Sequence, residues 1–520
     1  MSTIKAINFS HPSRPDPNIT LDIGGNMSTN TVSCNVMSVT NTLTANVSLS
    51  SLKYNNVTYI SKTGAGCMML FQNGRVYTAS GTSGGTGNQA TGRGQNGQIP
   101  VYGLDKFKAV AFPNETSSPI QCGTDGFNRS WALFANGNLY TWGLNNGGQM
   151  GVGNTTAYGF PVLSTTNVSD VYDHPTTSQR YPDNNRLIIR KRDGYLYATG
   201  YNGNGMLGVG DTTNRTSWTQ ITALGNSILN VWNMGATWGL TVVQKTDFTI
   251  WVCGYNGQGQ LGNGNTTTPQ SSFINVTTNW GGGSGYVLTK VIGGFGGWNG
   301  GDYASGWMGM LLDNGTTTIF RTCGYNGVAS LGDTTTTDRS TPITPNVGSG
   351  RIADVASFGD GQGGCLVLKP DGSLYTWGYN GHGQLGNGTT TNNPTPAINQ
   401  TGVAAILSNG CINYVQSLTS ATFIRKTADN GLYCTGYNGN AELGVGDRTN
   451  RTTYTKVLLP GDFVVSNLGW MATTYPVHTF LAQSTDGRFY AWGYNSQNTI
   501  ASDTTIDALV PHQITPFLGG

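Results

Sequence analysis

The chain has 520 residues and a mass of 55.0 kDa, and only 10% of them are charged, against about 25% in an average soluble domain. The formal net charge is +2 and Lys and Arg form no cluster, so neither a nucleic-acid partner nor an anionic membrane surface is expected. No stretch approaches about 18 apolar residues and the first twenty residues lack an apolar core, which predicts neither membrane insertion nor a signal peptide.

The first sixty residues differ in composition from the rest. Residues 1–18 include the turn-rich stretch "HPSRPDPN" with three prolines, which suits an extended anchor peptide. Residues 19–60 alternate apolar residues with Ser, Thr and Asn in short strands. This segment has too few apolar side chains to offset its ordering entropy alone, so it must pair with the rest of the chain or with other copies.

From residue 61 onward one pattern recurs eight times at spacings of 54 to 70 residues, as in "NGNLYTWG" and "DGSLYTWG". The copies end at Gly81, Gly143, Gly200, Gly254, Gly324, Gly378, Gly436 and Gly493. Asn-Gly or Asp-Gly supplies a two-residue hairpin turn in most copies, and alternating strand residues follow. Helical periodicity is absent, so the sequence predicts an all-β fold of small antiparallel sheets.

A glycine-rich phrase follows each copy, as in "GYNGHGQLGNGTTT" at residues 378–391. Glycines at fixed offsets indicate tight turns or close packing of backbone. One apolar residue in each phrase is expected to fill the core: Met150, Leu207, Leu261, Leu331, Leu385 and Leu443. A phosphate-binding loop is disfavoured, because no Lys-Ser/Thr pair and no helix start follow the glycines.

The stretch "DGSLYTWGYNGHGQLGNGTTTNNPTPAI" closely resembles a repeat of the RCC1 (regulator of chromosome condensation) family, and the similarity covers roughly residues 61–520. This resemblance implies a β-propeller, with eight blades favoured by the eight hairpins and seven possible. His478 and Thr479 match the family's His-Thr pair, which is missing in other repeats. The family's nucleotide exchange on a GTPase is not carried over, because no residues here match an exchange loop or a basic tail.

Residues 19–60 resemble the intertwined three-chain β-stalks of bacteriophage fibres in composition and rhythm. Together with the anchor at 1–18 and a large propeller at 61–520, they suggest a virion appendage. The partners implied are two further copies of the chain through residues 19–60, other virion proteins through residues 1–18, and a glycan or protein of the host surface. The alternative for the first sixty residues is a disordered leader followed by one extra edge hairpin.

Candidate catalytic residues form no convincing group, and the sequence predicts no enzyme, cofactor or metal site. Ser83 lies in "GTSGG", which matches a nucleophile elbow only by composition. Asp193, Asp371 and Asp486 occupy turns. The histidines share no metal-ligand spacing: His11, His174, His382, His478 and His512. The cysteines form no C-x-x-C pair and are expected to be small buried apolar residues: Cys34, Cys67, Cys122, Cys253, Cys323, Cys365, Cys411 and Cys434.

A tyrosine follows the glycine in six copies: Tyr201, Tyr255, Tyr325, Tyr379, Tyr437 and Tyr494. These rings could line one propeller face and stack on sugars, or they could pack between blades, as an identical position in each repeat favours. The function that the sequence indicates is a non-enzymatic virion fibre or decoration protein that attaches to a host surface. The alternative is an intracellular RCC1-like propeller that regulates a GTPase or another protein partner.

Overall fold

A computed structural model describes residues 108–112, 114–124, 129–173, 185–235, 238–283, 285–295, 306–359, 363–407, 421–472, 478–495 and 506–514, and strands at 8–9, 19–20, 57–60, 66–71 and 76–80. Contacts divide the chain into two compact units, Met1–Tyr54 and Asn55–Gly520. In the first unit, β1 (Asn8–Phe9) pairs antiparallel with β2 (Ile19–Thr20).

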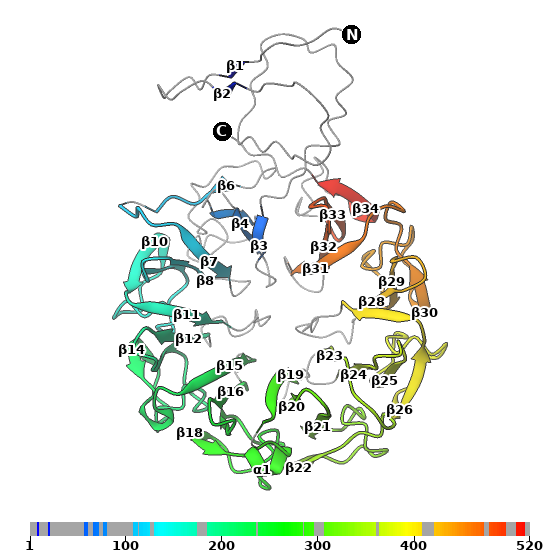
Figure 1. The fold of residues 1–520 in the computed structure, drawn as a ribbon, viewed down its shortest axis with the longest axis horizontal. Helices are drawn as coiled ribbons and strands as arrows, with labels where there is room; N and C mark the ends of the chain where they lie inside the picture. The colour runs from blue at the N-terminus through cyan, green and yellow to red at the C-terminus, as the bar shows by residue number, and fades with distance from the viewer. Residues whose placement is uncertain are drawn as a thin grey trace. The chain divides into compact units, whose positions relative to one another are not determined.

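Within the described residues, the second unit contains eight four-stranded antiparallel sheets arranged as a ring (Figure 1). Each sheet is built from four strands that are consecutive in the chain, and we number these sheets blades 1 to 8. Blade 1 comprises β3 (Val57–Ile60), β4 (Gly66–Phe71), β5 (Val76–Ser80) and β6 (Lys108–Ala109); blade 2 comprises β7 (Pro119–Thr124), β8 (Arg129–Phe134), β9 (Leu139–Gly143) and β10 (Tyr158–Thr165). Blade 3 comprises β11 (Val168–Tyr172), β12 (Arg186–Lys191), β13 (Leu196–Gly200) and β14 (Arg215–Gln220); blade 4 comprises β15 (Ile228–Met234), β16 (Leu240–Lys245), β17 (Ile250–Gly254) and β18 (Gln270–Asn275).

The other four blades repeat this arrangement. Blade 5 comprises β19 (Val287–Phe295), β20 (Gly306–Asp313), β21 (Thr318–Gly324) and β22 (Arg339–Ile343); blade 6 comprises β23 (Asp354–Phe358), β24 (Gly364–Leu368), β25 (Leu374–Gly378) and β26 (Asn393–Gln400). Blade 7 comprises β27 (Val403–Ile406), β28 (Ala421–Lys426), β29 (Leu432–Gly436) and β30 (Arg451–Lys456); blade 8 comprises β31 (Val465–Ala472), β32 (His478–Ser484), β33 (Phe489–Gly493) and β34 (Ala508–Ile514). Two short helical turns, η2 (Thr222–Leu224) and α1 (Thr277–Trp280), lie in connections.

The strands of a blade are apolar on both faces because each blade is packed between two others. Strand β24 is buried along its whole length, and successive side chains point to opposite faces. Cys365 and Val367 therefore enter the core shared with blade 5, whereas Leu366 and Leu368 enter the core shared with blade 7. The short apolar runs that follow each hairpin are thus explained by two inter-blade cores rather than by one solvent-facing side.

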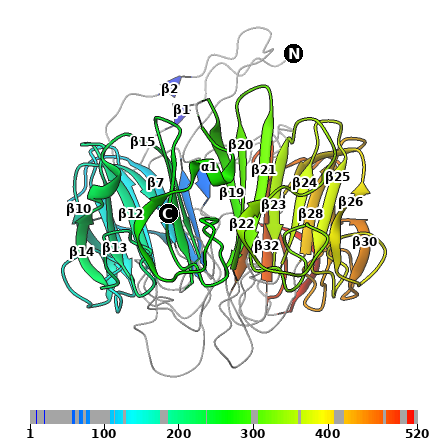
Figure 2. The same cartoon turned by 90° about the horizontal axis from the view of Figure 1, so that it is seen from below.

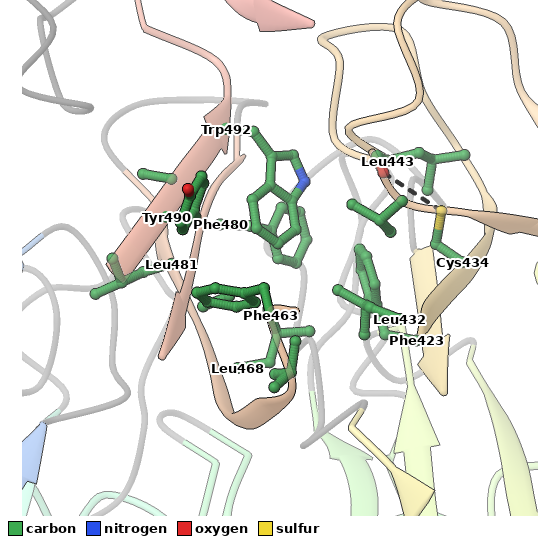
Figure 3. Packing of buried hydrophobic residues seen from close by; sticks show 14 of the residues in the cluster. Phe423, Leu432, Cys434, Leu443, Phe463, Leu468, Phe480, Leu481, Tyr490 and Trp492 are labelled. Atoms are coloured by element: carbon green, nitrogen blue, oxygen red, sulfur yellow. Dashed lines mark hydrogen bonds between the residues drawn. The ribbon is translucent and has the colours of Figure 1, made fainter. Parts of the chain in front are cut away.

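The junction of blades 7 and 8 shows how these cores are filled (Figure 3). Phe423 of blade 7 lies 4.8 Å from Phe480 of blade 8, measured between ring centroids. Phe480 in turn stacks on Trp492, with centroids 5.8 Å apart and an interplanar angle of 16°. Aromatic pairs of this kind add about 0.5–1.5 kcal/mol beyond the burial of their area.

The ring closes by packing and not by exchange of a strand. All four strands of blade 8 come from residues 465–514, and β31 contacts β4 of blade 1. The side view in Figure 2 shows the sheets standing next to one another around the ring. Each described blade is a small four-stranded sheet, so the arrangement leaves only short strand edges.

The predicted fold is confirmed: the described chain is almost entirely β-structure and forms a propeller, with the eight blades that the hairpins favoured. One boundary was wrong. Residues 57–60, placed at the end of the expected stalk, form β3 and pair with β4 in blade 1. Apart from β1, β2 and this strand, the anchor at 1–18 and the stalk at 19–60 lie outside the described residues. In the described part of the chain, no helix is both long and apolar enough to span a membrane.

Candidate functional site

Each glycine-rich phrase is built around a buried asparagine. In blade 6 this residue is Asn380, whose Oδ1 accepts a hydrogen bond from the backbone N–H of Leu385 at 2.9 Å. Its Nδ2 donates to the carbonyl oxygens of Thr389 at 2.9 Å and Thr391 at 3.1 Å. Its own backbone N–H donates to Oδ1 of Asn392 at 2.9 Å. One side chain therefore holds together the loop 380–392.

The bond from the N–H five residues later to the asparagine Oδ1 recurs around the ring, and we call these segments the glycine loops. They are residues 145–157, 202–214, 256–268, 326–338, 380–392 and 438–450, each beginning at its buried asparagine. Asn495 of blade 8 also bonds Asp507 and Ile506, at the offsets used in blade 6. The role of this asparagine was not predicted from the sequence, although its recurrence after each Tyr or Leu was a visible signal.

Two positions show why the glycines are needed. Gly386 has a φ of +67°, and a Cβ there would lie 2.4 Å from the ring of Tyr454 in blade 7. Gly388 has a φ of +83° but open space around it, so its requirement is conformational alone. Only glycine meets both demands without strain. The predicted role of the phrase as a connector with tight turns and close packing is confirmed.

The glycine loops also join successive blades through backbone hydrogen bonds. The N–H eight residues after each asparagine donates to a carbonyl in the outermost strand of the next blade. The pairs are Gly153 to Thr216 at 2.8 Å, Gly210 to Ser271 at 3.0 Å, Gly264 to Ser340 at 2.9 Å, Thr334 to Pro394 at 3.0 Å, Gly388 to Thr452 at 2.8 Å and Gly446 to Leu509 at 2.9 Å. The loops are therefore held on both sides, which fixes the surface they present.

The glycine loops lie at one end of the blades, which we call the loop face. Because every blade is an antiparallel meander, the connection between its third and fourth strands lies at the same end as that between its first and second. The hairpins with Asn-Gly or Asp-Gly lie at the other end, the hairpin face. Asp193 and Asp371 accept hydrogen bonds from backbone N–H groups two residues later there, at 2.9 and 2.8 Å, so their predicted turn role is confirmed.

The tyrosines of the phrases are half-buried on the loop face. The phenol of Tyr379 lies over Gly381, where a Cβ would be 2.1 Å from its Oη, and four other tyrosines lie over the equivalent glycine. Burial raises the pKa of Tyr201 and Tyr255 above 10. These rings pack on a glycine of their own loop and are half-exposed on the loop face, whereas the sequence analysis favoured packing between blades over an exposed ring on one face.

His382 links two adjacent glycine loops. Its ring meets the edge of Tyr437 in blade 7, with centroids 5.2 Å apart, and its Nδ1 lies 3.3 Å from Nδ2 of Asn450. Burial lowers the pKa of His382 below 6.5, which favours the neutral ring at pH 7. His512 is exposed in β34, and the side chains of the other three histidines lie outside the described residues.

Two arginines at the first position of a second strand are fully buried, and the sequence analysis missed both. Arg129 in β8 pairs with Asp173 at 2.5 Å, and Trp131 donates from Nε1 to the same carboxylate at 2.6 Å. Arg186 in β12 donates to the carbonyl oxygens of Met234 at 2.9 Å and Leu240 at 3.0 Å in blade 4. Burial lowers the pKa of Arg186 to about 9. These side chains join blades 2, 3 and 4 and are interior structural groups.

The cysteine prediction holds where the side chains are described. Five are free and buried: Cys122, Cys253, Cys323, Cys365 and Cys434. The thiol of Cys323 donates to the carbonyl of Gln260 in the preceding blade at 3.2 Å, and burial raises the pKa of Cys253 to about 12. Ser83 lies outside the described residues, and within them no three His, Cys, Asp or Glu side chains are placed to hold a metal ion.

One hollow of about 450 Å³ opens on the described surface beside the glycine loop of blade 5. It is lined by Asp333, Asp338, Arg339, Ser340, Thr341 and Ile343. Arg339 pairs with Asp333 at 2.7 Å, and hydrogen bonds from neighbouring side chains and backbone keep the pKa of Asp333 low despite the opposing effect of burial. The hollow is polar and open to solvent, which suits contact with another macromolecule more than enclosure of a small molecule.

Comparison with protein families matches residues 136–172 and 371–407 to the regulator of chromosome condensation (RCC1) repeat. The chain carries RCC1 repeats. Each match begins at the hairpin of blade 2 or blade 6, continues through its glycine loop, and ends in the first strand of the next blade. The predicted resemblance to RCC1 repeats is therefore confirmed, and the chain is an RCC1-like propeller.

Relatives of this RCC1-like propeller differ widely in length. The ultraviolet-B receptor UVR8 of Arabidopsis thaliana is 26% identical over 37% of this chain and 40% of its own length. The X-linked retinitis pigmentosa GTPase regulator of Homo sapiens is 25% identical over 36% of this chain and 18% of its own length. The structure of Prp20p from Saccharomyces cerevisiae is 16% identical over 74% of this chain and 87% of that chain, with a TM-score of 0.45. The matches thus span less than half the length of these two curated relatives.

Proposed function

We propose that this RCC1-like propeller is a non-enzymatic binding protein whose loop face recognises a protein partner. The observation that supports it is the construction of the glycine loops. Each is held from within by a buried asparagine and from outside by a backbone bond to the next blade. Side chains on such loops are already ordered, so binding costs less conformational entropy than it would on flexible loops.

The chemistry of the loop face suits a protein surface. Half-exposed tyrosines lie next to neutral Asn and Thr, and Arg215, directly after the loop 202–214, pairs with Asp211 of that loop at 2.7 Å. Tyr and Arg are enriched where proteins bind one another. One relative is named as a GTPase regulator, which makes a small GTPase the first partner class to test. This favours the RCC1-like regulator over the virion role that the sequence analysis placed first.

The test is binding by biolayer interferometry to purified small GTPases from each subfamily, nucleotide-free and GDP-bound. Tyr201→Ser and Tyr437→Ser remove rings from the loop face, and Asp371→Asn is the matched control on the hairpin face. We expect at least one GTPase to bind, with about tenfold weaker binding by the tyrosine variants and less than twofold change in the control. Equal loss in the control would refute the assignment of binding to the loop face, and no binding above that of an unrelated protein would refute a small GTPase as the partner.

A second candidate is display of the propeller on an oligomeric stalk in a virion. It is supported by the strand-like composition of residues 19–56 and by the division of the chain after Tyr54. The solution mass of the full chain and of residues 55–520 tests it, with the cut before β3 so that blade 1 stays complete. A full-length trimer with a monomeric truncation supports this candidate, and monomers of both refute it.

A further inference from the structure

The fourth residue after the buried asparagine has a repeated task in the glycine loops. In blades 2, 4 and 6 it is a buried glutamine whose Oε1 accepts a hydrogen bond from the backbone N–H two residues earlier. These bonds are Gln149 to Gly147 at 2.9 Å, Gln260 to Gln258 at 3.1 Å and Gln384 to His382 at 2.8 Å. In blade 7 the residue is Glu442, whose Oε2 accepts from Asn440 at 2.8 Å. An ionisable group thus takes the place of a neutral amide.

Glu442 is closed off from water and connected to two blades. Its side chain is buried, with 2% of the residue exposed, and its Oε1 accepts a second bond from Nδ2 of Asn440 at 3.0 Å. Its backbone carbonyl accepts a bond from Nε1 of Trp492 in blade 8 at 2.8 Å. Trp492 lies in the aromatic core between blades 7 and 8 (Figure 3). The backbone of Glu442 thus joins its loop to blade 8, while these bonds of its carboxyl lie within the loop.

Blade 3 provides a natural comparison for this junction. Residues 200–220 and 436–456 are identical except at six positions, and Glu442 corresponds to Met206 while Arg448 corresponds to Thr212. Both changes add an ionisable group to blade 7. Arg448 pairs with Asp507 of blade 8 at 2.7 Å and donates to the carbonyl of Gly439 at 3.1 Å. The loop of blade 3 has the same backbone pattern without these charges.

The groups around Glu442 shift the pKa of its carboxyl in opposite directions. The pKa of Glu442 is raised to about 7; burial is the main cause and the negative charge of Asp507 adds to it, whereas hydrogen bonds, including those from Asn440, act to lower it. From its own loop, Tyr437 is close enough for the carboxylate to raise the pKa of its phenol. His382 of blade 6 contacts that phenol ring. Loss of water from the carboxyl is thus the dominant effect.

We propose that Glu442 is a proton-operated latch of the glycine loop of blade 7, at the place where that loop bonds blade 8, closed when its carboxyl is neutral and easier to open when the carboxyl is ionised. Burial costs less for the neutral acid than for the anion, and the anion is better solvated in an opened loop. Blade 3, with methionine at this position, has no such dependence.

The pH dependence of loop opening follows from the protonation of Glu442 in the closed and in the opened loop. The closed loop keeps the proton up to about pH 7, whereas an opened loop releases it near the ordinary value of 4.5. Opening therefore becomes easier as pH rises from 4.5 to 7 and is independent of pH above that range. Between pH 6 and pH 8 the linkage relation gives about a tenfold increase in the equilibrium constant for opening.

The test is hydrogen exchange by mass spectrometry on the full chain at pH 6 and pH 8, with rates divided by the intrinsic rate at each pH. Peptides from 438–447 report blade 7, and peptides from 202–211 report blade 3 as an internal control. We expect protection in blade 7 relative to blade 3 to fall about tenfold between these pH values. Glu442→Gln and Glu442→Met should hold the ratio constant, and the second variant serves if the first does not fold.

Two outcomes would overturn the latch. A constant ratio in the unmodified protein would show that the carboxyl does not change state in this range. An equal fall in the unmodified protein and in both variants would show that another group is responsible. A fall confined to the unmodified protein assigns the latch to Glu442, and it is independent of which partner the loop face binds.

Discussion

Replacement of Asn380 by alanine tests whether a single buried amide holds a glycine loop together. The substitution leaves the N–H of Leu385 and the carbonyl oxygens of Thr389 and Thr391 without this partner. Each unsatisfied buried group costs about 1–3 kcal/mol, but two of the three lie near the surface, where water can replace the amide. We therefore expect a loss of about 3 kcal/mol in the stability of the loop.

The variant is measured both by hydrogen exchange of the loop and by the melting temperature of the whole protein. Local opening of residues 380–392, followed by hydrogen exchange, should increase about 100-fold, since 1.4 kcal/mol corresponds to a factor of ten. The melting temperature should fall by only about 3 °C, because the entropy of unfolding scales with the size of the propeller. The control is Asn226→Ala, at an exposed residue, for which we expect a change within about 0.5 kcal/mol.

Asn380→Asp sharpens the test. It keeps an acceptor for Leu385 but turns a carboxylate oxygen toward the carbonyl groups that Nδ2 now contacts, so it should destabilise the loop more than alanine above about pH 5. Below its pKa the acid is neutral and part of the loss should be recovered. If Asn380→Ala costs no more than the surface control, the loop is held by other contacts and the reasoning is refuted.

Three further predictions follow from the same structure. Gly386→Ala should destabilise blade 6 by more than about 3 kcal/mol, because the new Cβ would lie 2.4 Å from an aromatic ring. Gly388→Ala has open space around it and should cost only about 1 kcal/mol of backbone strain. Denaturant unfolding of the two variants compares these costs, and equal losses of stability would contradict the packing argument. Asp173→Ala should lower the free energy of unfolding by about 3–5 kcal/mol, because it removes the carboxylate beside the fully buried Arg129. Asp371→Asn, in a surface turn, is the control, and a decrease in melting temperature no larger than that of the control would refute the prediction. Glu442→Gln should make the protein more stable than the unmodified chain by up to about 3 kcal/mol at pH 8 and equally stable at pH 4.5. The reason is that the pKa of Glu442 is raised in the folded state, so the unmodified protein loses stability as pH rises from 4.5 to about 7. A stability difference that stays constant across this pH range would contradict the prediction.

Many features of the propeller can be predicted from short stretches of sequence. Asn-Gly and Asp-Gly pairs encode hairpins, and alternation over five or six residues encodes strands, so the repeat unit and the all-β class could be predicted. The glycines at fixed offsets indicated tight turns, and Gly386 and Gly388 have positive φ angles in the structure. The resemblance to RCC1 repeats then implied a ring, since sheets of this kind bury one another only by stacking.

Contacts between blades could not be read in the same way, because they join residues about fifty positions apart. Nothing local to Arg129 shows that it meets Asp173, and nothing local to Glu442 shows that its loop is closed by Trp492 of the next blade. The sequence by itself determined the turns and the hairpin strands of each repeat, because those depend on neighbouring residues. Only the tertiary structure decided which polar groups are buried and what they hold, because burial is created when one blade covers the next.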